Sequence, residues 1–332
     1  MARPLLCLAA LALTAAACTS SSPDEPEASS AEIDPVADPA PGSFVVAVDF
    51  ESLDPALGLT SPGAVVVDGD GSVLVAGERG AVALGGTTVA DAGGGAELAH
   101  SMALTGAGAV VGTGGAGTIS LARTLSGDPQ VVAGASRRLA GPPFAPGAQA
   151  EATEVGMPLV LDATTSGDVV YAALRFVELG EEEVSQVVRV QDGTLELVAG
   201  SRPQDCQVEP AAPATLAGLG RAGGVAVDRS GALLIADGDC AQLWRVGPEG
   251  LMMPATPGGA LADPLDVVTA PDGTAYVLDL GLDAVVAVAP DGTTREAVSG
   301  LSDADTSSQL ALDGEGRLWI TAGSQLLLAQ PA

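Results

Sequence analysis

Short apolar runs alternate with tight glycine turns along most of this chain, and one such arrangement recurs. In VAVDRSGALLIAD (225–237) an apolar run, a polar turn with glycine and a second apolar run follow one another. Apolar runs of about four to eight residues bounded by turn residues are typical of short β-strands. The chain is therefore predicted to be all-β. Five further copies are VVVDGDGSVLVAG (65–77), MALTGAGAVVGTG (102–114), DATTSGDVVYAA (162–173), VVTAPDGTAYVLD (267–279) and LALDGEGRLWITA (310–322).

The spacing of the units predicts a β-propeller. Their turn glycines recur at roughly 40-residue intervals in the second half of the chain, which is typical of blades with about four short strands. After the apolar run 326–329 the chain ends, so the last unit lacks a strand, whereas SFVVAVD (43–49) has no unit of its own. We therefore expect a six-bladed β-propeller whose ring is closed by the N-terminal strand, which completes the last blade.

One stretch carries a family resemblance. GGVAVDRSGALLIADGDCAQLWRV (223–246) resembles the NHL repeat, whose pattern is roughly GVAVD-x-x-G-x-LYIAD-x-x-N-x-R-I-x-K-V. The Gly/Ala/Pro-rich loops within 131–158 and 197–224 are similar to those of the bacterial form. The resemblance covers about residues 43–330, and the Asn of the pattern is absent at Ala241 and Gln242. It implies a binding face formed by the loops between blades and between second and third strands.

Charge narrows the range of partners. The chain has 42 acidic and 13 basic residues, a formal net charge of -29, and neither Lys nor Asn. A high-GC genome and adaptation to high salt both explain this composition. Nucleic acid and an anionic bilayer surface are excluded as electrostatic partners, because both would be repelled.

The N-terminus is predicted to be an export signal. Residues 1–17 contain Arg3 followed by a short apolar stretch, and AAAC then resembles a lipobox that ends at Cys18. Residues 19–42 are rich in Ser, Pro and acids, which predicts a disordered tether after a lipidated Cys18. The expected location is the extracytoplasmic face of the membrane, with the lipid as anchor. The A-x-A sequence at 15–17 leaves ordinary signal cleavage and free secretion as the alternative.

Two cysteines remain in the expected propeller. Cys206 and Cys240 are predicted to form a disulfide, as expected after export, and two free thiols are the alternative. They are not predicted to bind a metal, because no further Cys or His is available to complete a site.

Polar residues near the ends of the predicted strands are candidates for the binding face. Each has a simpler role as a turn, solvated or ion-paired residue. DGDG (68–71) lacks the spaced third acid and terminal Glu of a calcium loop, so an Asx-type hairpin turn is predicted there. No nucleophile motif such as GxSxG is present. The candidates are His100, Arg137, Arg138, Arg202, Asp237, Asp239 and Asp279.

The sequence leaves two functional hypotheses open. The first is a binding or scaffolding module, expected to be monomeric, that holds a protein or peptide of the cell envelope without a cofactor. The second is a hydrolase similar to gluconolactonase or strictosidine-synthase-like propellers, with a cation such as calcium at the channel mouth. The missing Asn and the single His, His100, count against the second. No residue argues for a third, purely structural role.

Overall fold

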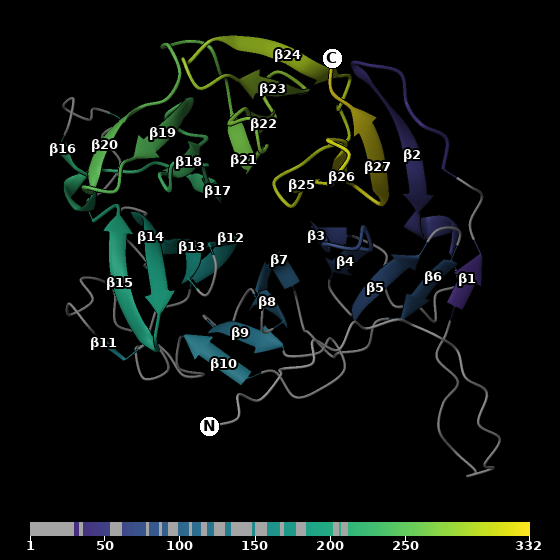
Figure 1. The fold of residues 1–332 in the computed structure, drawn as a ribbon, viewed down its shortest axis with the longest axis horizontal. Helices are drawn as coiled ribbons and strands as arrows, with labels where there is room; N and C mark the ends of the chain where they lie inside the picture. The colour runs from purple at the N-terminus through teal and green to yellow at the C-terminus, as the bar shows by residue number, and fades with distance from the viewer. Residues whose placement is uncertain are drawn as a thin grey trace, which may run out of the picture.

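The chain folds almost entirely into β-strands (Figure 1). A computed structural model describes residues 30–32, 36–53, 62–77, 80–85, 88–91, 99–105, 108–113, 118–122, 130–133, 148–149, 158–166, 169–176, 184–201, 206 and 212–332. The described helices include the 3-10 turns η1 (Phe50–Ser52) and η4 (Ala214–Leu216). None of the helices in this part of the chain is long and apolar enough to span a bilayer.

The described strands form six antiparallel sheets. The first contains β3 (Pro62–Val67), β4 (Val73–Gly77), β5 (Gly80–Gly85), β6 (Thr88–Asp91) and β1 (Ser30–Glu32). The second contains β7 (Ala99–Thr105), β8 (Gly108–Thr113), β9 (Thr118–Ala122) and β10 (Gln130–Ala133). The third contains β12 (Pro158–Ser166), β13 (Val169–Phe176), β14 (Val184–Gln191), β15 (Thr194–Ala199) and β11 (Ala148–Gln149).

The other three sheets follow the same plan. The fourth contains β17 (Ala222–Val227), β18 (Leu233–Asp237), β19 (Gln242–Val246), β20 (Leu251–Pro254) and β16 (Ala212–Pro213). The fifth contains β21 (Pro264–Thr269), β22 (Ala275–Asp279), β23 (Ala284–Val288) and β24 (Thr294–Ser299). The sixth contains β25 (Leu310–Leu312), β26 (Leu318–Ala322), β27 (Gln325–Gln330) and β2 (Ser43–Asp49).

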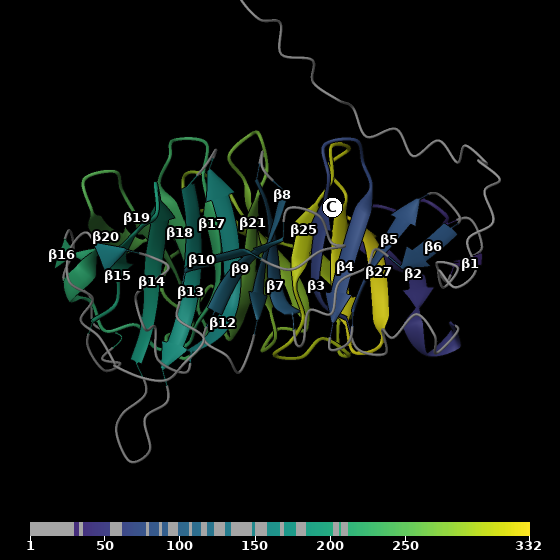
Figure 2. The ribbon, with the colours of Figure 1, turned by 90° about the horizontal axis from the view of Figure 1, so that it is seen from below.

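The sheets are arranged around a central axis, so the predicted all-β propeller is confirmed (Figure 1). The first strand of each sheet is innermost, and β3, β7, β12, β17, β21 and β25 contact one another in turn, with β25 also contacting β3. Figure 2 shows that the strands cross the thickness of the disc, so that turns and loops gather on its two faces. One face carries the β17–β18 and β23–β24 turns; the opposite face carries the β18–β19 and β22–β23 loops.

The N-terminal strand pairs with the last strand of the chain. β2 lies antiparallel to β27, with Ser43 opposite Gln330 and Asp49 opposite Gln325. Its buried residues Ala47 and Val48 contribute to a core cluster shared with the first and sixth sheets. Residues 43–49 therefore supply the outer strand that the last unit lacks, as predicted.

Three short strands differ from the expectations. β1 lies within the predicted disordered tether and pairs with β6 on the outside of the first sheet. β11 and β16, which end the two long segments between units, pair with β15 and β20 in the same way. An outer strand exposes unpaired backbone groups, and an added strand satisfies them. The described ends of both long segments therefore cover blade edges rather than project from a face.

The predicted disulfide is present. Cys206 and Cys240 are bonded, with Cα atoms 5.2 Å apart. The bond joins the segment before the fourth sheet to the loop between β18 and β19. Since the loop that it closes contains about 35 residues, it stabilises the fold by about 3–4 kcal/mol in the chain-entropy description.

Candidate functional site

Asp237 and Asp279 end the second strands of the fourth and fifth sheets, as the sequence predicts, but their side chains are fully buried. The two Asp279 oxygens accept hydrogen bonds from the backbone N–H groups of Ala262 (2.8 Å), Asp263 (2.9 Å) and Leu282 (3.1 Å). These donors lie in the connection before β21 and in the loop after β22. The carboxylate therefore ties both segments to the strand end.

Asp237 plays the same part in the fourth sheet. It accepts hydrogen bonds from the N–H of Gly220 (3.0 Å), the Nε1–H of Trp244 (3.2 Å) and the N–H of Cys240 (3.3 Å). Burial raises the pKa of Asp237 although these hydrogen bonds oppose the shift. Asp237 and Asp279 end their strands at the predicted loop face, but both carboxylates are buried and bonded to groups of neighbouring segments.

Asp239 lies in the β18–β19 loop and is ion-paired. Its Oδ1 lies 3.6 Å from the Nε of Arg221, whose guanidinium also bonds Asp263. The Arg221 side chain is only 13% exposed, so it links two loops across the fourth and fifth sheets. Asp239 is therefore on the predicted face, but its charge is offset by a neighbour.

The remaining candidates cannot be placed in the same way. Arg137, Arg138 and Arg202 lie outside the described residues. His100 falls within β7, and its side chain lies outside what the structure describes.

The six innermost strands enclose a central channel with a cavity of about 280 Å³. In every sheet the innermost strand pairs with the second strand in an equivalent register, so corresponding residues of the six strands can be identified. Near the face that carries the β18–β19 and β22–β23 loops, one residue from each strand lies at the same level. These residues are Ala64, Ser101, Asp162, Gly224, Asp266 and Gln309.

Among the cavity-lining side chains that the structure describes, the carboxylate is that of Asp266. Its Oδ1 accepts a hydrogen bond from the N–H of Val267 (2.7 Å), and its Oδ2 accepts one from the N–H of Leu310 (2.6 Å) in the sixth sheet. On the other side it lies against Gly224, where an added Cβ would come within 2.5 Å of the Asp266 Cα and clash with Oδ1. The carboxylate thus spans three neighbouring sheets.

Burial raises the pKa of Asp266 to about 7, against the effect of its two hydrogen bonds. A carboxyl group with such a pKa exists in both protonation states near neutral pH, which suits a general acid or base. A strongly shifted group beside a cavity is a recognised indication of a functional site.

The repeat contains a signal for Asp266. In five of the six units the residue at this level stands seven positions before the turn glycine. It is Ala, Ser, Gly, Asp or Gln there, and the third unit has Asp162 at the same level, so two units carry an acid. The third unit departs because β12 and β13 are joined by a shorter turn, with Ser166 opposite Val169.

The predicted cation site does not fit these residues. Among the described residues no three His, Cys, Asp or Glu side chains are grouped so that they could hold a metal ion. Asp237 and Asp279 are each bonded to three donors and have no exposed surface. A cation would have to displace N–H groups that these carboxylates hold.

Comparison with known proteins establishes the fold class. No family of known sequences and no curated protein matches this chain. Among solved structures, a Xanthomonas campestris gluconolactonase is 13% identical over 82% of this chain and 87% of its own, with a TM-score of 0.61. A second gluconolactonase-like protein is 17% identical over 89% and 93%, with a TM-score of 0.60.

A calcium-binding protein, regucalcin from Agrobacterium tumefaciens, is 12% identical over 86% of this chain and 94% of its own, with a TM-score of 0.54. All three likenesses are below the level at which identity carries function. The chain is thus a β-propeller protein, and its activity has to be argued from the channel.

Proposed function

We propose that this chain is a gluconolactonase-like propeller hydrolase whose reaction takes place in the central channel beside Asp266. The observation that carries the proposal is the channel-lining carboxylate of Asp266, which has a pKa of about 7 near the end of the channel toward the β18–β19 and β22–β23 loops. The similarity to gluconolactonase structures supports a small ester-like substrate, such as a lactone.

Asp266 would act as the general base. The ionised carboxylate takes a proton from water as the water oxygen bonds to the lactone carbonyl carbon. When the ring C–O bond breaks, the leaving alkoxide takes the proton back, which yields the hydroxy acid and restores the carboxylate. The N–H groups of Val267 and Leu310 hold the carboxylate in place, because each bonds a different oxygen.

The test is hydrolysis of a panel of sugar and aliphatic lactones by the purified full-length mature protein. We expect turnover that increases with pH through about 7, because the ionised Asp266 is the active form. Asp266→Asn should lower kcat/KM by at least about 100-fold, the usual contribution of a general base. Asp239→Asn, on the same face but outside the cavity lining, is the matched control and should retain activity.

Three outcomes would overturn the proposal: no lactone is hydrolysed, the Asp266→Asn variant keeps its activity, or both variants lose it equally. Melting temperatures of the variants distinguish loss of chemistry from loss of fold. Saturable binding of a protein or peptide without turnover would favour the binding or scaffolding role instead. The residues expected to carry that role, Arg137, Arg138 and Arg202, lie outside the described residues.

We also propose that the six sheets are six blades of a closed, NHL-like ring in which β2 completes the last blade. The β2–β27 pairing and the contact of β25 with β3 support closure. Truncation before residue 50 tests it. Loss of the β2 strand should convert a monomer into aggregates or mixed oligomers, because β27 then becomes an exposed edge.

We propose further that the protein is exported and held at the membrane by a lipid on Cys18. The Cys206–Cys240 disulfide supports an oxidising compartment. Intact mass of the membrane-extracted protein tests this: a mass that matches an unmodified Cys18 contradicts the anchor.

A further inference from the structure

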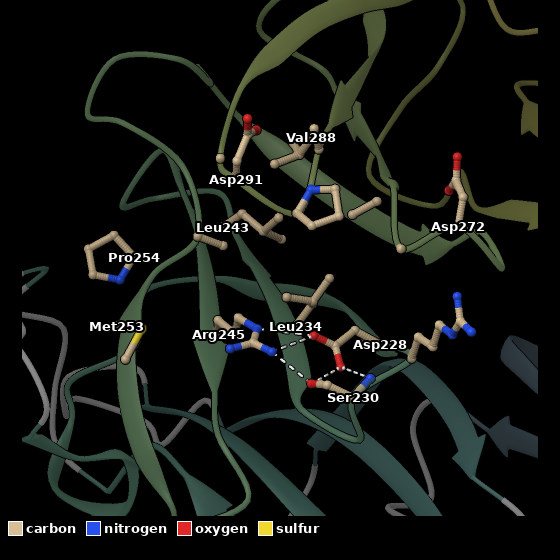
Figure 3. A pocket seen from close by; sticks show the side chains of 17 residues that line it. Asp228, Ser230, Leu234, Leu243, Arg245, Met253, Pro254, Asp272, Val288 and Asp291 are labelled. Atoms are coloured by element: carbon tan, nitrogen blue, oxygen red, sulfur yellow. Dashed lines mark hydrogen bonds and ion pairs between the residues drawn. The ribbon is translucent and has the colours of Figure 1, made fainter.

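A cavity of about 600 Å³ separates the fourth and fifth sheets (Figure 3). It is lined by the β17–β18, β21–β22 and β23–β24 turns, so it opens on the face opposite the end of the channel where Asp266 lies. Its volume is typical of sites for small organic molecules. The proposed hydrolysis does not use it.

The inner part of this inter-blade cavity is apolar. Leu234, Leu243 and Val288, from the facing sheets, form its floor and are almost fully buried, whereas the exposed apolar lining includes Met253 and Pro254. Met253 at its edge is 39% exposed, unusual for so apolar a side chain in this protein. Such a lining favours an apolar ligand body, because contact with it removes further apolar surface from water.

The charged groups of one wall neutralise each other. Arg245 donates from Nε (3.0 Å) and Nη2 (2.9 Å) to Oδ2 of Asp228, and from Nη2 to Oγ of Ser230 (2.7 Å) (Figure 3). Burial alone would raise the pKa of Asp228, but the hydrogen bonds from Ser230, Arg245 and Ala232 outweigh it and lower the pKa. The pair is therefore ionised and carries no net charge.

The remaining charges leave the cavity negative. Asp272 and Asp291 are exposed on two turns, where each accepts a hydrogen bond from the N–H two residues ahead, Thr274 or Thr293 (both 2.9 Å). These hydrogen bonds lower the pKa of both carboxyls, so both are anionic at neutral pH. Arg229 supplies one opposing charge among the lining residues, and Arg295 lies near enough to Asp272 to contribute to its lowered pKa. The chain as a whole, at -29, adds a field of the same sign.

We propose that this inter-blade cavity binds a small amphipathic cation, with its apolar body between Leu234, Leu243 and Val288 and its positive group toward Asp272 and Asp291. An apolar interior and a net negative rim complement such a ligand in shape and charge. This site is independent of Asp266 and of the proposed hydrolysis.

Calorimetric titration of the full mature protein tests the proposal with three probes of equal chain length: octyltrimethylammonium, octanesulfonate and octyl glucoside, each kept below its micelle concentration. We expect one saturable site that binds the ammonium at least about fivefold more tightly than the sulfonate, because the two rim carboxylates attract the first probe and repel the second. The preference should decrease with salt.

Two variants locate the binding. Asp272→Asn combined with Asp291→Asn should remove the preference for the cation. Asp70→Asn is the matched control, because Asp70 makes the same turn hydrogen bond, to the N–H of Ser72 (3.0 Å), outside the cavity lining. Ala255→Phe places a ring in the cavity and should abolish binding of all three probes while the melting temperature is retained.

The proposal is overturned by any of three results. The first is equal binding of the ammonium and the sulfonate, and the second is the lack of a saturable site for either probe. The third is that Asp70→Asn weakens the preference for the cation as much as the double variant does. The last result would assign the preference to the overall charge of the chain. Lactone hydrolysis by the Ala255→Phe variant should be unchanged, so failure here and failure of the hydrolase proposal are distinguishable.

Discussion

Asp266 and Asp279 belong to one sheet and are both buried, yet they occupy different surroundings. Asp279 receives three backbone hydrogen bonds from the segments that flank its own strand. Asp266 receives two, one of them from the next sheet, and lines a cavity. The comparison shows that burial alone does not distinguish the two carboxylates, whereas the number and origin of their donors do.

The largest expected effect comes from the structural carboxylate. Asp279→Ala leaves the N–H groups of Ala262, Asp263 and Leu282 without acceptors, at about 1–3 kcal/mol each. We expect the free energy of unfolding to fall by about 5 kcal/mol in urea denaturation. Asp239→Ala, in the equivalent loop of the fourth sheet but exposed, is the control and should cost about 1 kcal/mol or less. A loss below about 1 kcal/mol for Asp279→Ala would mean that water or other groups replace the carboxylate.

The second effect concerns pH. Because burial raises the native pKa of Asp266 to about 7, the folded protein keeps this proton at pH values where the unfolded chain has lost it. The contribution of Asp266 to stability is therefore most favourable below about pH 4, decreases as pH rises to about 7 and is constant above, a total change of about 4 kcal/mol.

This contribution appears in the difference between wild type and Asp266→Asn, measured by urea denaturation at several pH values. Between about pH 4 and 7 the free energy of unfolding of the variant should rise relative to that of the wild type, because the amide of the variant does not titrate. Carboxyl groups that do not interact with Asp266 cancel in the difference. A difference that is independent of pH would show that Asp266 has an ordinary pKa and would remove it from the candidate site.

The third effect separates the loop face from the channel. Cys206→Ser with Cys240→Ser removes the bond that fixes the β18–β19 loop, where Asp237 accepts the N–H of Cys240. We expect a loss of about 3 kcal/mol in the free energy of unfolding. The pH dependence assigned to Asp266 should be unchanged, because its hydrogen-bond donors, Val267 and Leu310, belong to the fifth and sixth sheets. Altered pH dependence would mean that the two regions are coupled.

The smallest effect is expected at an exposed turn. Asp70→Asn keeps the oxygen that accepts the N–H of Ser72, so the free energy of unfolding should not change measurably. Thermal denaturation is the measurement. A loss similar to that of Asp279→Ala would contradict the view that donor number and burial together decide the structural role.

The repeat made much of the fold predictable. Alternating apolar runs and turns predicted the second strands that end at Asp237 and Asp279. The apolar run 43–49, which has no unit of its own, predicted that β2 pairs with the last strand. The turn at 68–71 is the predicted hairpin, with Asp70 bonded to the N–H of Ser72. Local sequence carries these features because turn chemistry and strand alternation act over a few residues.

The site was less predictable, because it depends on which residues from different sheets meet. From the sequence, Asp237 and Asp279 are predicted to be exposed strand ends, because the segments that cover them come from elsewhere in the chain. Asp266 lies next to an apolar run, so the sequence predicts only that it belongs to a strand. Its bond to Leu310 and its contact with Gly224 exist only once three sheets are assembled.

The pairing of β2 with β27 also has a consequence for the order of folding. A ribosome makes residues 43–49 long before residues 325–330, so this pairing cannot form until both segments have been made. Bringing together segments so far apart in sequence carries a high loop-closure entropy and slows folding. Until then β2 lacks its partner strand, and the unfinished chain is exposed to misassembly there.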